Sequence, residues 1–286
     1  MSSSAGLDIR LDPTGRRRTL NWEFALGLVI VGLMVLSGLL APLIAPYPPN
    51  QIDILNSLQA PSFSHLMGTD FVGRDVFSRV LFGLRIDIFV VALITYAGLV
   101  IGVMIGTISG YFGGWLDAVI GRIADTVVAF PFIVLVLAVV AIVGPGLKGV
   151  AIGIVVVGWA LYARLSRSEM LAMREQPFML ATRALGYSNA RAIFRHALPN
   201  LVRSSLVYST VDVVVNMLVL AGMSYLGLGQ QAPGADLGSI IASGQSYLLS
   251  AWWITTIPGI VLVLFGIGVS MIGDGITRGE LSMATV

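Results

Sequence analysis

Long apolar stretches, each close to the length of a membrane-spanning helix, constrain this chain more than any other feature of its sequence. An α-helix needs about 20 predominantly apolar residues to cross the roughly 30 Å hydrocarbon core of a bilayer. Because lipid offers the backbone no hydrogen-bond partners, a spanning segment of this kind must be helical. Six stretches qualify, the fourth being short: 24–45, 88–109, 116–143, 150–165, 201–226 and 251–272. The sequence therefore predicts an all-α membrane protein with six transmembrane helices.

The composition agrees with the membrane class and excludes others. Only 11% of the residues are charged, whereas an average soluble protein carries about 25%. A soluble surface needs more charge than this, which excludes a soluble enzyme, a disordered chain and a nucleic-acid binder. The chain has no cysteine and only two histidines, His65 and His196, so we expect no disulfide and no metal site.

The basic residues predict how the chain is oriented in the membrane. With a cytoplasmic N-terminus, 13 of the 17 Lys and Arg residues fall on the cytoplasmic side, as the positive-inside rule requires. The first stretch is longer than the 7–15 apolar residues of a signal peptide, so we interpret it as a retained helix. The predicted order begins with a cytoplasmic tail (1–23), a first helix (24–46) and an extracytoplasmic loop (47–86). A five-helix domain (84–274) follows, which contains a cytoplasmic segment (166–200), and a cytoplasmic tail (275–286) ends the chain. Both termini are therefore predicted to lie in the cytoplasm.

The cytoplasmic segment 166–200 is expected to hold two short helices. The first runs over 168–185, with Pro177 as a break or kink and Gly186 as the C-cap. Ser188 caps the second helix, 189–197. We expect Pro199 to stop that second helix.

One face of the second short helix is apolar. Its members at spacings of three and four residues are Ala190, Ile193, Phe194 and Ala197, with Arg191 and Arg195 beside them. Two interpretations fit this pattern. The segment is either a solvated basic loop that serves the positive-inside rule, or a docking element that offers a small apolar face to a soluble partner.

The same segment resembles a known motif. Residues 180–186, followed nine residues later by 196–199, are similar to the cytoplasmic loop of type I ABC importer permeases. That motif is Glu-Ala-Ala, three residues, Gly, nine residues, Ile, one residue and Leu-Pro. The matching positions are Ala181, Gly186, Leu198 and Pro199, whereas Leu180 replaces the Glu and Thr182 the second Ala. The segments 65–70, 110–115, 226–229 and 272–275 resemble the dipeptide/oligopeptide/nickel branch of these permeases.

The resemblance implies a type I ABC importer permease fold and a set of partners. These are a second homologous permease subunit, two cytoplasmic ATPase subunits and an extracytoplasmic solute-binding protein, assembled in a bacterial or archaeal cytoplasmic membrane. The implied substrates are di- or oligopeptides or a related small solute. ATP and Mg²⁺ would be bound by the ATPase subunits, and this chain would hold no cofactor. The sequence agrees, because its only lysine, Lys148, precedes Gly149 and no phosphate-binding Gly-x-x-x-x-Gly-Lys-[Ser/Thr] is present.

By the same resemblance, the cytoplasmic segment would be the loop that couples the permease to the ATPases. The residues implied for that ATPase-coupling loop are Ala181, Thr182, Ala184, Leu185, Gly186, Ser188, Arg191, Ile193, Phe194, Arg195, Leu198 and Pro199.

A carboxylate in the fifth stretch is the other informative feature. Asp212 lies near the middle of that span, and Asn216 and Leu220 follow on the same helix face. The family often has a Glu at the position of Leu220. A carboxylate at the bilayer centre costs about 2.5–3.5 kcal/mol, so it normally faces a bundle interior or a water-filled path. We hypothesise that Asp212 and Asn216 line the translocation path; the alternative is an interhelical hydrogen bond.

Two other function classes compete with the importer. An ion-coupled secondary transporter would use Asp125 and Asp212 as ion sites, but it needs no ATPase-docking loop. A membrane-embedded enzyme would need a nucleophile–base pair or metal ligands, which the sequence lacks. For Asp125 we expect either an ion pair with Arg122 on the same helix or a contact to the partner permease.

Features near the outer ends of the spans have simpler interpretations. The charged residues of the first outer loop either contact the solute-binding protein or cap one another: Asp70, Arg74, Asp75 and Arg79. The pair Trp252–Trp253 is expected to be an interfacial anchor. The stripe of Gly98, Gly102 and Gly106 suits close helix packing.

Overall fold

A computed structural model describes residues 22–284, so almost all of the tail predicted over 1–23 lies outside the described residues. This part of the chain is helical apart from loops and one isolated β-bridge. The elements are α1 (Trp22–Leu39), α2 (Ala41–Ile44), η1 (Ile54–Asn56), α3 (Val76–Phe112), α4 (Gly114–Ala129), α5 (Phe132–Val143), α6 (Leu147–Met173), α7 (Pro177–Ala184), α8 (Asn189–Arg191), the π-helical turn η2 (Ala192–Ala197), α9 (Leu198–Tyr225), α10 (Leu237–Gly244), η3 (Gln245–Tyr247) and α11 (Trp253–Ala284). The prediction of an all-α chain is confirmed.

Five helical segments are long and apolar enough to cross a membrane, and a bent pair provides a sixth candidate. The single span predicted over 116–143 is in fact α4 and α5, which meet at an angle of 99°. Pro131 explains the break, because it has no N–H to donate and keeps the residue before it out of the helical region. Phe130 is accordingly extended, with φ −87° and ψ 149°.

The second span is much longer than predicted and shortens the first loop. Its helix, α3, begins at Val76 rather than near residue 88, because the side chain of Asp75 caps it by accepting from the backbone N–H of Ser78 (2.7 Å). Residues 76–86, predicted as part of the loop 47–86, are therefore helical.

The fourth span is also longer than predicted. Its helix, α6, continues to Met173, so the first half of the short helix predicted over 168–185 is the end of this span. The break comes at residues 174–176, and Pro177 is the first residue of α7, a position where its missing N–H costs nothing.

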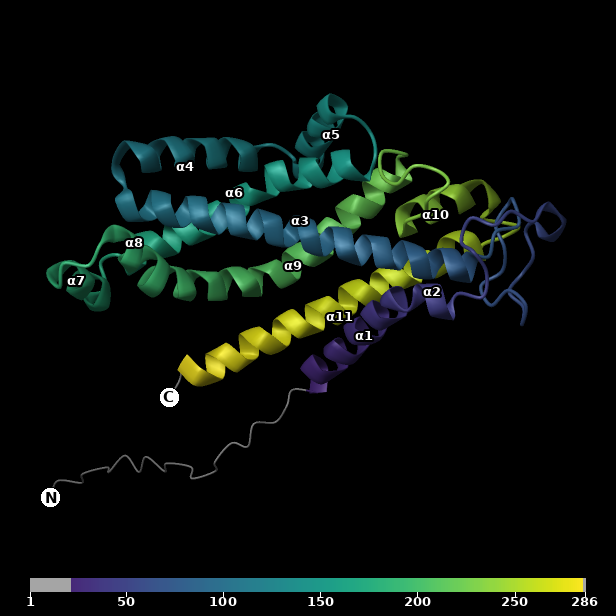
Figure 1. Cartoon of the computed structure of the whole chain (residues 1–286), viewed down its shortest axis with the longest axis horizontal. Coiled ribbons are helices and arrows are strands. Elements are labelled where there is room, and N and C mark those ends of the chain that lie inside the picture. The colour runs from purple at the N-terminus through teal and green to yellow at the C-terminus, as the bar shows by residue number, and fades with distance from the viewer. Residues whose placement is uncertain (1–21, 285–286) are drawn as a thin grey trace, which may run out of the picture.

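Glycines bring the long helices together. On α3, a Cβ at Gly106 would lie 2.2 Å from the carbonyl oxygen of Ala163, and one at Gly102 would lie 2.4 Å from that of Trp159. The predicted packing role of this stripe is confirmed by these contacts with α6. Figure 1 shows α1 beside α11, where Gly27 meets Gly268 in the same way. The main apolar core lies among α3, α5, α6, α9, α10 and α11.

Candidate functional site

The predicted coupling loop lies at one end of the molecule, opposite the loop between α2 and α3 (Figure 1). A small apolar cluster fixes it to the helix ends beneath. The members of this cluster are Tyr111, Met170, Met179, Ala192, Ile193, Ala197 and Leu201. They come from α3, α6, α7, η2 and α9, so the loop is packed onto three long helices.

The turn between the two short helices has the geometry that the sequence predicts. Gly186 has a φ of +71°, which glycine adopts without strain and which suits a helix C-cap. Ser188 is extended, and its hydroxyl oxygen accepts from the backbone N–H of Arg191 (3.4 Å). Both predicted caps are present.

The prediction that Pro199 stops the second short helix is wrong. The helix continues through α8, η2 and α9, and these together form one candidate span from Asn189 to Tyr225. Pro199 lies in the first turn of α9. In a regular α-helix its ring would clash with the carbonyl four residues earlier. The π-helical turn directly before it widens the backbone at this point and removes that conflict.

The predicted apolar stripe divides into a buried and an exposed half. Ile193 and Ala197 are buried in the cluster that fixes the loop, whereas Phe194 is 53% exposed. On the neighbouring turn Leu185 is 70% exposed. Leu185 and Phe194 are therefore the most exposed large apolar side chains among the described residues of this loop.

The other residues predicted for the coupling loop also divide into exposed and buried positions. Ala181, Ala184, Gly186, Ser188, Arg191, Arg195 and Pro199 are exposed, and Leu198 is half-buried. Thr182 is buried, and its hydroxyl donates to the carbonyl oxygen of Met179 (2.7 Å). Leu180, which stands where the motif has Glu, is exposed.

Two tyrosines of this site were missed by sequence reasoning. The hydroxyl of Tyr111, at the end of α3, donates to the side-chain carbonyl oxygen of Asn189 (3.0 Å). The ring of Tyr187 lies 5.2 Å from the guanidinium of Arg191 and stacks with the ring of His196 at 5.8 Å. No spacing rule connects Tyr111 with residues almost 80 positions later, so only the fold reveals this contact.

The structure brings Asp212 and Asn216 together in a buried polar cluster. Asp212 accepts hydrogen bonds from the hydroxyl of Tyr162 on α6 and from the amide of Asn216, both at 2.9 Å. The same amide lies 2.9 Å from the hydroxyl oxygen of Thr95 on α3. All four side chains are buried. The bonds with Tyr162 and Thr95 are the interhelical hydrogen bonds that the alternative interpretation expected. Tyr162 and Thr95 were not predicted.

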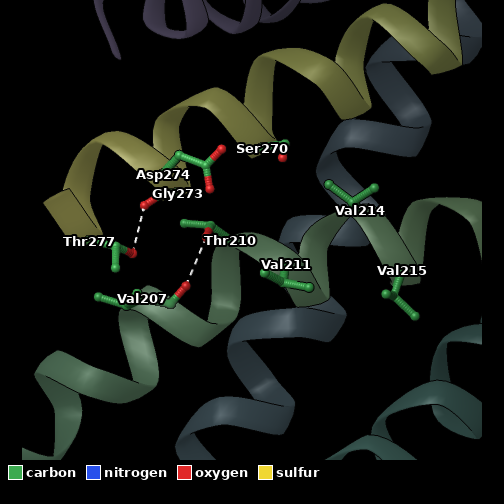
Figure 2. A pocket seen from close by; sticks show the side chains of 9 residues that line it. All are labelled: Val207, Thr210, Val211, Val214, Val215, Ser270, Gly273, Asp274 and Thr277. Atoms are coloured by element: carbon green, nitrogen blue, oxygen red, sulfur yellow. Dashed lines mark hydrogen bonds between the residues drawn. The ribbon is translucent and has the colours of Figure 1, made fainter. Parts of the chain in front are cut away.

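A cavity of about 210 Å³ lies on another face of α9, between α9 and α11. Figure 2 shows Asp274 and Ser270 on α11 opposite Thr210 and a row of valines on α9. The hydroxyl of Thr210 donates to its own helix, to the carbonyl oxygen of Val207 (2.8 Å). None of the residues predicted for the translocation path lines this cavity.

The charged residues of the first loop cap one another. Asp70 pairs with Arg74 at 2.6 Å and lies 3.8 Å from Arg79. Asp75 caps α3 and contacts the ring of His65 at 3.0 Å. Asp70, Asp75 and Arg79 are buried, so they hold the loop together.

Two smaller predictions are wrong in part. Arg122 and Asp125 form no ion pair among the described residues; on the same helix it is Asp117 that pairs, with Arg167 of α6 (2.7 Å). Trp253 is buried and donates its indole N–H to the carbonyl oxygen of Thr69 (3.1 Å). Of this pair, Trp252 alone has the exposure of an interfacial anchor.

The long apolar helices and the loop packed on their ends define a polytopic membrane protein. Residues 102–279 match the family described as "Binding-protein-dependent transport system inner membrane component", and residues 21–61 match the N-terminal transmembrane domain of oligopeptide transport permease C. The chain belongs to the first of these families. It is a permease component of ABC importers and not an enzyme.

Curated relatives share most of the chain. The dipeptide transport system permease protein DppC of Alkalihalophilus pseudofirmus is 38% identical over 87% of this chain and 82% of its own. The probable D,D-dipeptide transport system permease protein DdpC of Escherichia coli is 36% identical over 87% and 83%. A solved structure of the methionine ABC transporter MetNI has a chain with a TM-score of 0.50 and 20% identity, covering 67% of this chain and 93% of its own. This likeness supports the type I ABC importer permease fold.

Proposed function

We propose that this chain forms half of the translocation path of an importer for di- or oligopeptides in a bacterial cytoplasmic membrane. The observation that carries the proposal is its 38% identity, over 87% of its length, to a dipeptide permease. Its partners are a second homologous permease subunit, two ATPase subunits that bind ATP and Mg²⁺, and an extracytoplasmic solute-binding protein. The N- and C-termini lie in the cytoplasm.

The segment 166–200 docks the ATPase in this proposal. Support comes from the packing. Because the loop is fixed to three long helices, a movement of an ATPase bound to its exposed apolar face would be transmitted to those helices. Phe194 and Leu185 form that face, and Ile193 anchors it from beneath. The exposed arginines 191 and 195 flank it. Exposed apolar side chains outside the membrane mark contact sites.

Co-purification tests this assignment. A tagged chain expressed with its partner genes should retain both ATPase subunits in detergent. Phe194→Glu should lower the ATPase recovered at least about tenfold, since it puts a charge into the centre of an apolar contact. Leu180→Glu is the matched control, because it adds the same charge at an exposed position where the family motif already carries it.

Two results would count against the proposal. If the unmodified chain retained no ATPase, the importer assignment would fail. If Phe194→Glu and Leu180→Glu retained ATPase equally well, the importer assignment would remain valid. The assignment of Phe194 and Leu185 to the docking face would then be wrong.

A further inference from the structure

Helix α4 carries two charged side chains of opposite sign that the packing of this chain leaves without a partner. Arg122 and Asp125 are both exposed, and neither of their side chains forms an ion pair or a hydrogen bond within residues 22–284. The guanidinium of Arg167 acts on Asp125 only at longer range, because it already donates to both carboxylate oxygens of Asp117. One cation and one anion are therefore available on α4.

Both charges lie deep in the membrane-spanning part of the chain. Helix α4 runs back alongside α3 from the end that carries the coupling loop (Figure 1). Trp115 in its first turn is 77% exposed, which is typical of a residue at the membrane interface. At 1.5 Å per residue, Arg122 lies about 10 Å beyond Trp115 and Asp125 about 15 Å beyond it, which is half of the roughly 30 Å hydrocarbon core. Because a charge at that depth is costly in lipid, it faces protein or a water-filled path.

The exposed side of α4 divides into two stripes. The charged stripe, at spacings of four, three and four residues, consists of Ala118, Arg122, Asp125 and Ala129. The apolar stripe beside it consists of Trp115, Val119, Ile123 and Phe130. Thr126 also lies on the apolar stripe, and its hydroxyl donates to the carbonyl oxygen of Arg122 in its own helix (2.8 Å). The apolar stripe therefore suits lipid, whereas the charged stripe does not.

We propose that the charged stripe lines the translocation path, where Arg122 binds the terminal carboxylate of a short peptide and Asp125 binds its terminal ammonium. A guanidinium can bind a carboxylate through two parallel hydrogen bonds. Residues three apart on a helix have Cβ atoms about 5–6 Å apart, and two residues of extended chain span about 7 Å. The two side chains can thus reach both termini of a dipeptide but only one terminus of a longer peptide. The inference rests on the proposed function, which supplies the peptide and the path.

Cysteine labelling of the assembled complex in lipid nanodiscs tests whether the charged stripe faces water. The chain has no cysteine of its own. Ala129→Cys should react with a water-soluble methanethiosulfonate at least about ten times faster than Ile123→Cys on the apolar stripe, because the reactive thiolate forms only where water reaches it. Ile123 lies nearer to the start of α4, so depth alone would favour the opposite order. The labelling is read on this chain after separation of the subunits.

Uptake by proteoliposomes tests the two charges. Asp125→Asn and Arg122→Gln should each lower the maximum rate of dipeptide uptake at least about tenfold, because each removes a hydrogen bond to a charged group. The concentration of loaded solute-binding protein that gives half of the maximum rate should stay unchanged, since the peptide meets these residues after its release. Thr126→Val on the apolar stripe is the control and should transport within about twofold of the unmodified complex.

Three results would overturn the inference and leave the proposed function in place. The first is normal dipeptide uptake by both Asp125→Asn and Arg122→Gln. The second is labelling of Ala129→Cys as slow as that of Ile123→Cys. The third is loss of the second permease from either purified neutral variant, because the charges would then hold the two permeases together. If instead the unmodified complex imported no peptide with ATP and the solute-binding protein, the proposed function itself would fail.

Discussion

The buried carboxylate of Asp212 is held by two hydrogen-bond donors. The hydroxyl of Tyr162 and the amide of Asn216 both end on the same oxygen. A buried donor that loses its acceptor costs about 1–3 kcal/mol. The cluster therefore stabilises the contact of α9 with α6 and α3, whether or not it also lines the translocation path, a role that stays a prediction.

Two substitutions of Asp212 distinguish packing from a role in the path. Asp212→Ala removes the acceptor of the Tyr162 hydroxyl and one of the two acceptors of the Asn216 amide. It should lower the free energy of unfolding by about 2–4 kcal/mol, read as a lower melting temperature in detergent. Asp212→Asn keeps an acceptor oxygen and should lose about 1 kcal/mol or less. Val211→Ala, on the exposed side of α9, is the control.

Peptide uptake per folded complex is measured on the same variants. A role in packing alone predicts nearly normal uptake by Asp212→Asn. Loss of uptake by this variant at an unchanged melting temperature would instead favour the path interpretation.

The types and spacing of the coupling-loop residues could be predicted from the sequence. Which of them are buried and which are exposed could not. The caps at Gly186 and Ser188 follow from local backbone chemistry, which the sequence carries. Ile193 and Phe194 are equally apolar neighbours, and only the packing of η2 against α6 and α7 buries one and exposes the other. Likewise, Tyr162 could not be assigned to Asp212 before the helices were in place.

At the scale of elements, the contact between α3 and α6 depends on glycines. The α3 backbone approaches so closely at Gly106 that a Cβ there would lie 2.2 Å from a carbonyl oxygen of α6. Such a contact cannot be relieved by turning a side chain, because the atom struck belongs to the backbone. Small residues of this kind let transmembrane helices approach each other.

Gly106→Ala should therefore destabilise the protein although alanine is the better helix former. We expect a loss of about 1–3 kcal/mol from overpacking, measured as a lower melting temperature in detergent. Gly158→Ala on α6 has open space at its Cβ and should be neutral or gain up to about 1 kcal/mol. Equal melting temperatures for the two variants would contradict the close packing described for α3 and α6.

The elements themselves were predictable where apolar length decided them. The ends were not, because they depend on caps and on neighbouring helices: α3 and α6 extend far past their apolar stretches. Proline had two different effects. Pro131 breaks a span, whereas the helix continues through Pro199, which lies in the first turn of α9 directly after a π-helical turn. Sequence alone does not distinguish these two cases, because the difference is the π-helical turn that precedes Pro199 and not Pro131.

At the scale of the whole molecule, two polar ends enclose the apolar spans. One end carries the coupling loop, and the other carries the loop between α2 and α3 (Figure 1). The basic residues predict the first end to be cytoplasmic. The absence of cysteine from the chain makes this orientation simple to test.

Single cysteines placed at the two ends should label from opposite sides of the membrane. Ser64→Cys and Ala184→Cys are both at exposed positions. In intact cells or spheroplasts a membrane-impermeant maleimide should modify Ser64→Cys only, and in inverted vesicles it should modify Ala184→Cys only. Labelling of Ala184→Cys in intact cells would reverse the proposed topology.

The most direct test of the whole account is peptide uptake by proteoliposomes that contain this chain, its partner permease, both ATPase subunits and the solute-binding protein. We predict accumulation of a labelled dipeptide or oligopeptide that requires ATP and the binding protein and is insensitive to collapse of ion gradients. Uptake that is driven by an ion gradient and proceeds without ATP or the ATPase subunits would contradict the account.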